Sequence, residues 1–152
     1  MKIELYDSAK HWEEIKKMLF EDTEWSVLLG KDGWIFDPED SCTFWDFKIV
    51  GTVNDKIVWY CFWGNVDSME RYAFINKLYV HKHFRQKWYA KELLDRSKEY
   101  YKQIWITQLR LKVFAINKTA IDFYRKYWFE YKGCHEESCN LWDLNFYHLN
   151  LK

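Results

Sequence analysis

The sequence predicts an α/β protein in which helices pack on a mixed β-sheet, as one domain over residues 1–152. The chain is long enough to bury most of its apolar surface in a single core. Hydrophobic residues make up 49% and charged residues 30% of it, which is a globular rather than a disordered mixture. Segments with the two-residue period of strands alternate with segments of helical period, in the order βα, loop, βββ, α, β, α, ββ.

The expected elements follow from these periods and from the turn residues between them. Strands are expected over residues 2–6, 44–52, 57–63, 72–81, 109–113, 129–132 and 141–149. Helices are expected over about 8–21, 86–104 and 117–127, with Ser8 and Asn117 as N-caps. Asn54-Asp55 is expected to turn a hairpin. Residues 22–42 hold loop signals such as Asp37-Pro38, with room for a short helix.

Charge and hydropathy weigh against several classes of function. Lys plus Arg equal Asp plus Glu at 23 each, whereas a general nucleic-acid binder normally carries a basic excess. No segment reaches the roughly 18 apolar residues of a membrane helix, so no membrane partner is expected. The first ten residues, MKIELYDSAK, lack the apolar stretch of a signal peptide. We therefore expect a cytoplasmic protein that binds neither membrane nor nucleic acid.

Two sets of residues have the chemistry of metal ligands without the spacing of a metal site. Cys134, His135 and Cys139 lie close in sequence, yet no second pair with matching spacing completes four ligands. His81 and His83 would share one face of a strand, although a polar strand end explains them as well. We expect reduced thiols and no metal.

Two segments in the second half carry the most specific pattern. They read LYVHKHFRQKWYAKELL over residues 78–94 and LRLKVFAINKTAIDFYRKYWFEYKG over residues 109–133. From about residue 44 to 149 the chain resembles the GNAT superfamily of N-acetyltransferases, whose pattern is L-x-V, R-x-x-G-x-G/A and, later, N-x-x-A-x-x-F-Y-x-K-x-G-F. The residues in register are Leu78, Val80, Arg85, Ala90, Leu93, Asn117, Ala120, Phe123, Tyr124, Lys126 and Phe129. The resemblance implies the GNAT fold, with a mostly antiparallel sheet of six to seven strands flanked by about four helices.

The resemblance implies acetyl-CoA as the co-substrate. Its pyrophosphate would meet a loop made of Arg85, Gln86, Lys87, Trp88, Tyr89 and Ala90. Main-chain N–H groups of such a turn suit a phosphate, as does the positive end of the helix dipole. The pantetheine arm would meet backbone groups of Leu78, Tyr79 and Val80. An ordinary strand-to-helix turn ahead of an amphipathic helix is the alternative.

The resemblance also implies roles in acyl transfer. Tyr124 would contact the cofactor and act as the general acid, because a phenol with a pKa of about 10 is suited to protonating a thiolate. Asn117 would cap its helix and contact the cofactor. Packing alone for Tyr124 and capping alone for Asn117 are the alternatives. Backbone N–H groups near residues 78–80 would stabilise the oxyanion.

The residue that removes the proton of the amine is left open. Family members often carry a glutamate near the middle of the central strand, where this chain has Asn76. Glu70, Asp67 or an ordered water could act instead. Each of these carboxylates, taken alone, is more commonly a solvated surface charge.

Four tryptophans stand where glycine is expected, at Trp59, Trp88, Trp105 and Trp128, in a chain with only 5 Gly but 10 Trp. Glycine and tryptophan codons can differ by one base, and some genetic codes read TGA as glycine. One hypothesis is therefore that these positions are glycines conceptually translated as tryptophan. The alternative is a genuinely tryptophan-rich protein with a filled cofactor loop. A true Trp88 is expected to weaken acetyl-CoA binding or displace the loop, because a side chain there obstructs the phosphate.

The expected function is transfer of an acetyl group from acetyl-CoA to a primary amine, by direct attack in a ternary complex. A non-catalytic GNAT-fold protein that binds acyl-CoA or regulates a partner is the alternative, favoured by Trp88 and Asn76. A carbohydrate- or nucleic-acid-binding domain, suggested by the 21% aromatic content, explains neither motif. The acceptor amine, which the variable residues 20–40 and 134–142 would meet, is left open. Homodimers are common in this superfamily, so the resemblance is compatible with one.

Overall fold

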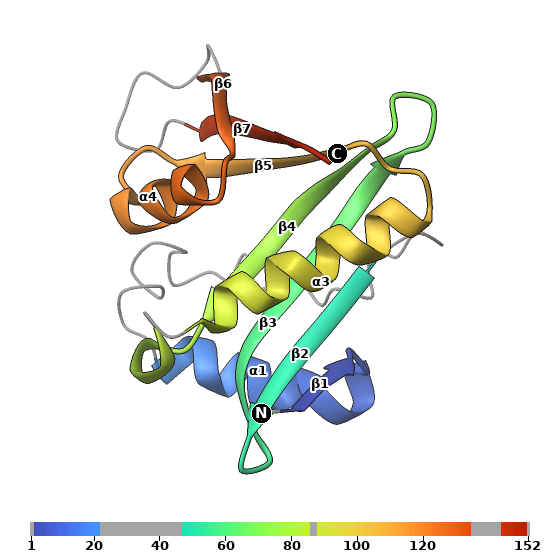
Figure 1. Cartoon of the computed structure of the whole chain (residues 1–152). Coiled ribbons are helices and arrows are strands. Elements are labelled where there is room, and N and C mark those ends of the chain that lie inside the picture. The colour runs from blue at the N-terminus through green and yellow to red at the C-terminus, as the bar shows by residue number, and fades with distance from the viewer. Residues whose placement is uncertain (1, 22–46, 86–87, 135–143, 152) are drawn as a thin grey trace.

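The computed structural model describes residues 2–21, 47–85, 88–134 and 144–151 (Figure 1). Within these ranges the side chains of Phe20, Asn65 and Asn76 are not described. The loop expected over residues 22–42, with its room for a short helix, lies outside the described residues. Among the helices of the described ranges, none is both long and apolar enough to cross a membrane.

Seven strands form one sheet with the order β1-β2-β3-β4-β5-β7-β6. Their bounds are β1 Lys2–Leu5, β2 Phe47–Val53, β3 Lys56–Asp67, β4 Tyr72–Val80, β5 Gln108–Phe114, β6 Glu130–Cys134 and β7 Leu144–Asn150. All neighbouring strands are antiparallel except β4 and β5, which are parallel. The expected mixed, mostly antiparallel sheet is therefore confirmed.

Helices cover both faces of this sheet. The described residues form three α-helices, against about four expected: α1 (Ser8–Glu21), α3 (Tyr89–Gln103) and α4 (Lys118–Lys126). A short 3-10 helix, η2 (Lys82–Phe84), follows β4. In Figure 1, α3 crosses the front of the sheet and α1 lies behind it.

Each face of the sheet has its own hydrophobic core, because successive side chains of a strand point to opposite faces. On the α1 face, Ile15 of the helix packs with Val50 and Tyr79 of the strands. On the other face, Leu94 of α3 and Tyr124 of α4 belong to a single larger core. Helices α3 and α4 are therefore held on the same side of the sheet.

The β2–β3 hairpin turns at Asn54 and Asp55, as the sequence predicts. Val53 pairs with Lys56, so the loop has two residues. Both loop residues have positive φ, 51° for Asn54 and 60° for Asp55. This left-handed conformation at both positions is that of a type I′ turn, and Asn and Asp are the residues other than glycine that tolerate it best.

Candidate active site

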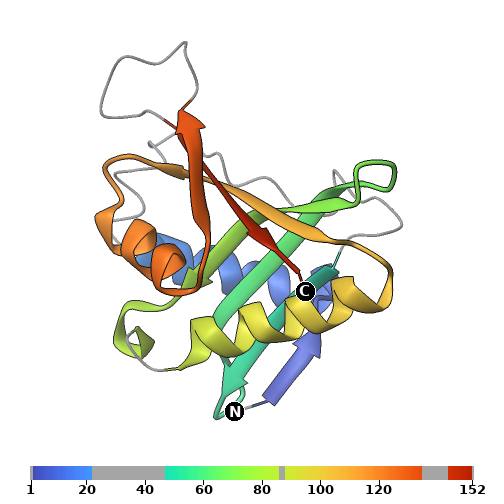
Figure 2. The same cartoon turned by 45° about the horizontal axis from the view of Figure 1, so that its top comes forward.

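The sheet opens between its two parallel strands. Strands β4 and β5 pair only from Tyr72 with Gln108 to Ile75 with Leu111. Beyond that point β5 stays paired with β7 as far as Phe114, while β4 stays paired with β3 as far as Val80. Figures 1 and 2 show the two strands diverging toward α4 and the start of α3.

One side of the β4 backbone over residues 76–80 consequently faces the opening instead of a strand of the described chain. Leu78 and Val80 pack with the core under α3 and α4, whereas the side chain of Tyr79 is buried in the core under α1. The opening thus faces one side of the β4 backbone at residues 78–80. An open side of a strand can bind an extended ligand as a further strand would bind.

The chain turns sharply at the end of β4. The His81 N–H donates to the Val58 carbonyl at 2.8 Å, and the ring of His81 accepts from the His83 N–H at 3.4 Å. Arg85 folds back over this turn: its Nε donates to the Val80 carbonyl at 3.0 Å. The guanidinium carbon lies 5.8 Å from the centroid of the Tyr79 ring. A positive charge is therefore held beside the end of β4.

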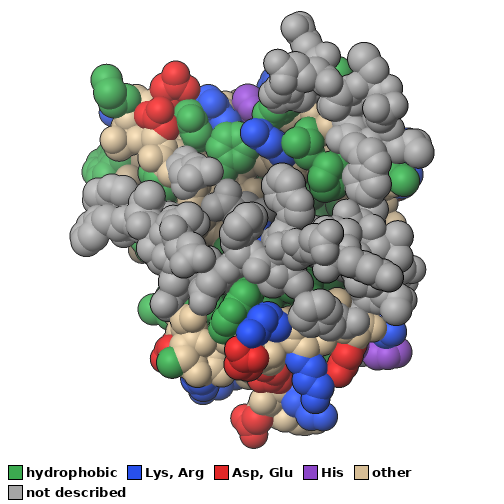
Figure 3. All heavy atoms as spheres, turned by 180° about the vertical axis from the view of Figure 1, so that it is seen from behind, with side chains coloured by type: hydrophobic (Ala, Val, Ile, Leu, Met, Phe, Trp, Pro, Cys, Tyr) green, Lys and Arg blue, Asp and Glu red, His purple; other side chains and the backbone are tan. Residues whose placement is uncertain are grey.

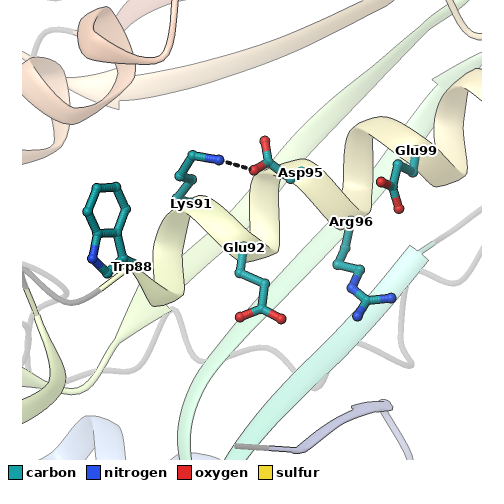
Figure 4. Close-up of a pocket in the computed structure, with 6 residues that line it drawn as sticks. All are labelled: Trp88, Lys91, Glu92, Asp95, Arg96 and Glu99. Carbon is teal, nitrogen blue, oxygen red and sulfur yellow. Dashed lines mark hydrogen bonds and ion pairs between the residues drawn. The ribbon is translucent and has the colours of Figure 1, made fainter.

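Helix α3 begins next to this turn, with Trp88 at its N-cap. No side chain caps the helix there, although Asp, Asn, Ser and Thr normally do. Tyr89 and Ala90, both half-buried, form its first turn, while Gln86 and Lys87 lie outside the described residues. The N-terminal amides of a helix attract anions. In this structure the exposed ring of Trp88 stands beside them, near Lys91 (Figure 4).

Tyr124 reaches the same region from α4. Its side chain is 7% exposed, with the ring centroid 5.5 Å from that of Phe129. Burial raises the pKa of the Tyr124 phenol, and the nearby Cys61 thiol raises this pKa further. Because Cys61 on β3 is paired with Leu78 on β4, the phenol lies at the level of the opening. Its raised pKa keeps it protonated, as a proton donor must be.

Asn117 caps α4, as the sequence predicts: its Oδ1 accepts from the Ala120 N–H at 3.1 Å. We expect Asn117→Ala to lower the free energy of unfolding by about 1 kcal/mol, because a first-turn N–H loses its acceptor. Urea denaturation measures this loss, and Asn117→Ser is the control that should keep most of the stability. An unchanged unfolding free energy in Asn117→Ala would contradict the capping role.

The two acidic residues considered as a base lie at the opposite end of β4 from residues 76–80. Asp67 Oδ1 accepts from the N–H groups of Met69 at 2.9 Å and Glu70 at 2.8 Å, which fixes the turn before β4. Glu70 forms an exposed ion pair with Arg110, at 3.5 Å. Both carboxylates therefore have local structural partners away from the opening.

Sequence reasoning gave no role to two ionisable groups of β3 and β4, and it expected one of them, Lys77, simply to alternate outward beside Asn76. Cys61 is fully buried, and burial raises the pKa of its thiol to about 12, against hydrogen bonding with Ser97 and Trp63. Lys77 is half-buried, and burial lowers the pKa of its ammonium group. A lone cysteine in an apolar strand carries no signal, but a lysine within the apolar run YAFINKLYV does.

The α1 face of the sheet is aromatic and basic beyond the opening. The guanidinium carbon of Arg110 lies 3.7 Å from the ring centroid of Tyr72, and Lys112 Nζ lies 5.2 Å from that of Phe146. From behind, Figure 3 shows hydrophobic and basic side chains next to one another in the upper half of the molecule. Cations stacked on ring faces are attracted by the ring quadrupole.

Comparison with known proteins shows which family this chain is similar to. Residues 3–129 match the sequence model of the acetyltransferase (GNAT) family. A probable acetyltransferase from Staphylococcus epidermidis has a similar structure, with a TM-score of 0.79 and 16% identity over 99% of both chains. A ribosomal-protein-alanine N-acetyltransferase from Brucella melitensis gives 0.74 and 17%, over 99% of this chain and 100% of that one.

A third similar structure contains the co-substrate. It is described as a streptothricin acetyltransferase from Bacillus anthracis in complex with acetyl coenzyme A, with a TM-score of 0.63 and 18% identity over 70% of this chain and 64% of that one. No curated protein matches the chain. At these identities the structures show a shared fold, and the match over residues 3–129 shows the family.

Proposed function

Because this chain belongs to the GNAT family of acetyltransferases, we propose that it transfers the acetyl group of acetyl-CoA to a primary amine of a small molecule or protein. The amine attacks directly, in a ternary complex. The observation that carries the proposal is the opening between β4 and β5, which begins where their pairing ends and lies near an uncapped helix N-terminus and a buried phenol. Acetyl-CoA is made inside cells, so we expect the protein to act in the cytoplasm.

The open side of β4 is suited to the pantetheine arm. The amide groups of the pantetheine arm can pair with main-chain groups of Leu78, Tyr79 and Val80, as one strand pairs with the next. This pairing would hold the thioester at a fixed depth in the opening. An N–H near residues 78–80 then lies close to the thioester carbonyl and stabilises the oxyanion as it forms.

The turn between β4 and α3 is suited to the pyrophosphate. The amides at the start of α3 have no side-chain cap, and Arg85 brings a positive charge to the same turn. Hydrogen bonds to an anion from cationic and main-chain donors are stronger than neutral ones. Residues 85–90 fit the phosphates chemically, and the Trp88 ring is the one described group that obstructs their approach.

In the reaction, the amine nitrogen bonds to the carbonyl carbon and the carbon–sulfur bond breaks. The departing thiolate takes a proton from the Tyr124 hydroxyl, which is protonated at neutral pH. The amine attacks in its neutral form, and its surplus proton leaves to a base that we do not assign. Proximity within one opening supplies much of the rate.

An acetyl-CoA thiol-release assay across amine classes tests the proposal. Polyamines, amino acids, aminoglycoside-type antibiotics and peptides with free N-termini or lysines form the panel. We expect thiol release that depends on one of these classes. Acetyl-CoA binding without release from any of them would instead support a non-catalytic acyl-CoA-binding protein, and absence of binding would contradict both.

The Trp88→Gly variant is expected to bind acetyl-CoA at least about tenfold more tightly than the parent chain with Trp88. Removing the ring lets a phosphate reach the first-turn amides of α3, and one hydrogen bond to a charged group is worth about 1.5–3 kcal/mol. Isothermal titration calorimetry measures the Kd. The matched control is Trp105→Gly, at the other end of α3, which should leave the Kd unchanged. Equal affinities for Trp88→Gly and the parent chain would contradict phosphate binding at this turn.

A further inference from the structure

Helices α3 and α4 end in the same hydrogen-bonding pattern. After α3, the Ile106 N–H donates to the Tyr101 carbonyl at 3.0 Å and the Trp105 N–H to the Lys102 carbonyl at 3.2 Å. After α4, the Phe129 N–H donates to the Tyr124 carbonyl and the Trp128 N–H to the Arg125 carbonyl, both at 3.0 Å. These paired bonds define the Schellman motif, in which the residue just beyond the helix cap is left-handed and usually glycine.

Tryptophan holds that left-handed position in both motifs. Trp105 has φ 66° and Trp128 has φ 68°. A side chain with a Cβ is strained there, because the Cβ approaches the following carbonyl oxygen. Asn and Asp, as in the β2–β3 turn, ease the strain by local hydrogen bonds, but an indole has no such means.

The rings of these tryptophans make no compensating contacts with the core. Trp105 is 80% and Trp128 is 81% exposed. The apolar contact that accompanies each motif comes instead from its neighbours, such as Phe129 against Tyr124 with ring centroids 5.5 Å apart. A tryptophan normally stabilises a fold by burying a large apolar area, whereas these two side chains are both strained and exposed.

Trp88 has the same exposure in a related position. It is 80% exposed at the N-cap of α3, where its side chain makes no capping hydrogen bond. Glycine is among the residues accepted at an N-cap, whereas bulky apolar residues are not. Three tryptophans of the described chain thus stand at helix ends where glycine is a better choice.

Two other tryptophans behave in the ordinary way. Trp63 is fully buried, and its Nε1 donates to Ser97 Oγ at 2.6 Å. Trp59 is also fully buried, and its ring lies over Gly51, where an added Cβ would come within 1.8 Å of Trp59 Cε2. A glycine opposite an aromatic residue is a known pairing between strands. The structure therefore gives no reason to include Trp59, although the family pattern has glycine there.

We infer that the natural protein carries glycine at positions 88, 105 and 128, and that its gene is read with a code in which TGA specifies glycine. One kind of replacement, tryptophan for glycine at all three positions, explains both the two strained helix ends and the exposed helix start. The inference stands on the left-handed φ of Trp105 and Trp128 and on the exposure of all three side chains, so it does not require the proposed acetyl transfer.

The inference changes what the surface hollows mean. Three hollows of about 580, 830 and 80 Å³ are lined in part by Trp88, Trp128 and Trp105 respectively. With glycine at these positions each hollow loses a wall. In Figure 4 the hollow beside Trp88 lies along the charged outer face of α3, with the Lys91–Asp95 ion pair. The other lining residues of each hollow are unaffected by the replacement, as is the strand pairing that defines the opening between β4 and β5.

The coding gene and the native protein test the inference directly. We expect TGA codons at 88, 105 and 128, and TGG codons at Trp63. Peptides from the natural source, sequenced by mass spectrometry, should contain glycine at the three positions. Tryptophan in the native peptides at position 88, 105 or 128, or a TGG codon at any of the three, would overturn the inference.

Thermal unfolding of recombinant variants tests its physical basis. Trp105→Gly and Trp128→Gly should each melt about 2–4 °C above the matching Trp→Ala variant, because only glycine relieves the left-handed strain. Trp63→Gly should instead melt about 2–4 °C below Trp63→Ala, since glycine adds backbone freedom in a strand, and both should melt far below the parent because the buried ring is lost. Equal melting temperatures for the Gly and Ala variants at 105 and 128 would overturn the argument from strain.

Discussion

Replacing Tyr124 with phenylalanine is expected to lower kcat roughly 10²- to 10⁴-fold, the range that general acid catalysis contributes. The substitution keeps the buried ring and its contact with Phe129 but removes the proton that the thiolate needs. The Kd of acetyl-CoA and the melting temperature should change little. Steady-state thiol release, with calorimetry for the Kd, makes the measurement.

Tyr127→Phe is the matched control, one residue past the end of α4. The ring of Tyr127 packs at a tilt against Phe123, with ring centroids 4.7 Å apart, and is less buried than Tyr124, so losing its hydroxyl should leave kcat unchanged. Equal kcat values for Tyr124→Phe and the parent chain would mean that Tyr124 only packs. The pH profile of kcat gives a further test. Because the pKa of Tyr124 is raised above its usual value of about 10, ionisation of the phenol should not lower kcat at any pH below about 10.

Trp63→Ala is expected to lower the free energy of unfolding by about 3–5 kcal/mol, because it empties the space of a large buried ring. The ring packs edge-on against Tyr101 of α3, with centroids 5.3 Å apart, and its Nε1 donates to Ser97 of the same helix. Trp63 thereby ties the middle and the C-terminal part of α3 to β3. Urea denaturation measures the loss.

Two companion variants separate the causes of that loss. Trp63→Phe keeps most of the ring but deletes the donor to Ser97, so the free energy of unfolding should fall by about 1 kcal/mol. Trp12→Ala removes the same ring from a half-buried position on α1 and should cost clearly less than Trp63→Ala. A smaller loss for Trp63→Ala than for Trp12→Ala would contradict the anchoring role of Trp63.

The sequence predicted the kinds and order of the described elements well, because each core-facing strand and helix carries its own period. Its errors lie at element ends. The pattern ends the second hairpin strand at residue 63, whereas β3 continues to Asp67 through Gly64, since pairing with β4 and its bulges extends the strand. The helix expected from residue 86 is described only from Tyr89. Turn residues mark a local preference, which a neighbouring strand can override.

The candidate site could be predicted only in part. The Asn117 cap follows from a local motif, and the role proposed for Tyr124 from the family pattern. The opening itself could not be predicted, because apolar residues continue along β4 past the point where β5 turns away. No residue pattern in either strand indicates where their pairing ends. Cys61 becomes notable only once its burial is known.

Four residue pairs join β4 to β5, and they are the only strand pairing between the β1–β4 half of the described sheet and the β5–β7 half. Beyond this short seam, the core under α3 and α4 holds the two halves together. An extended molecule that bonds to both diverging strands would lengthen the seam. Its binding energy would then also stabilise the folded state, so that occupancy and resistance to unfolding rise together.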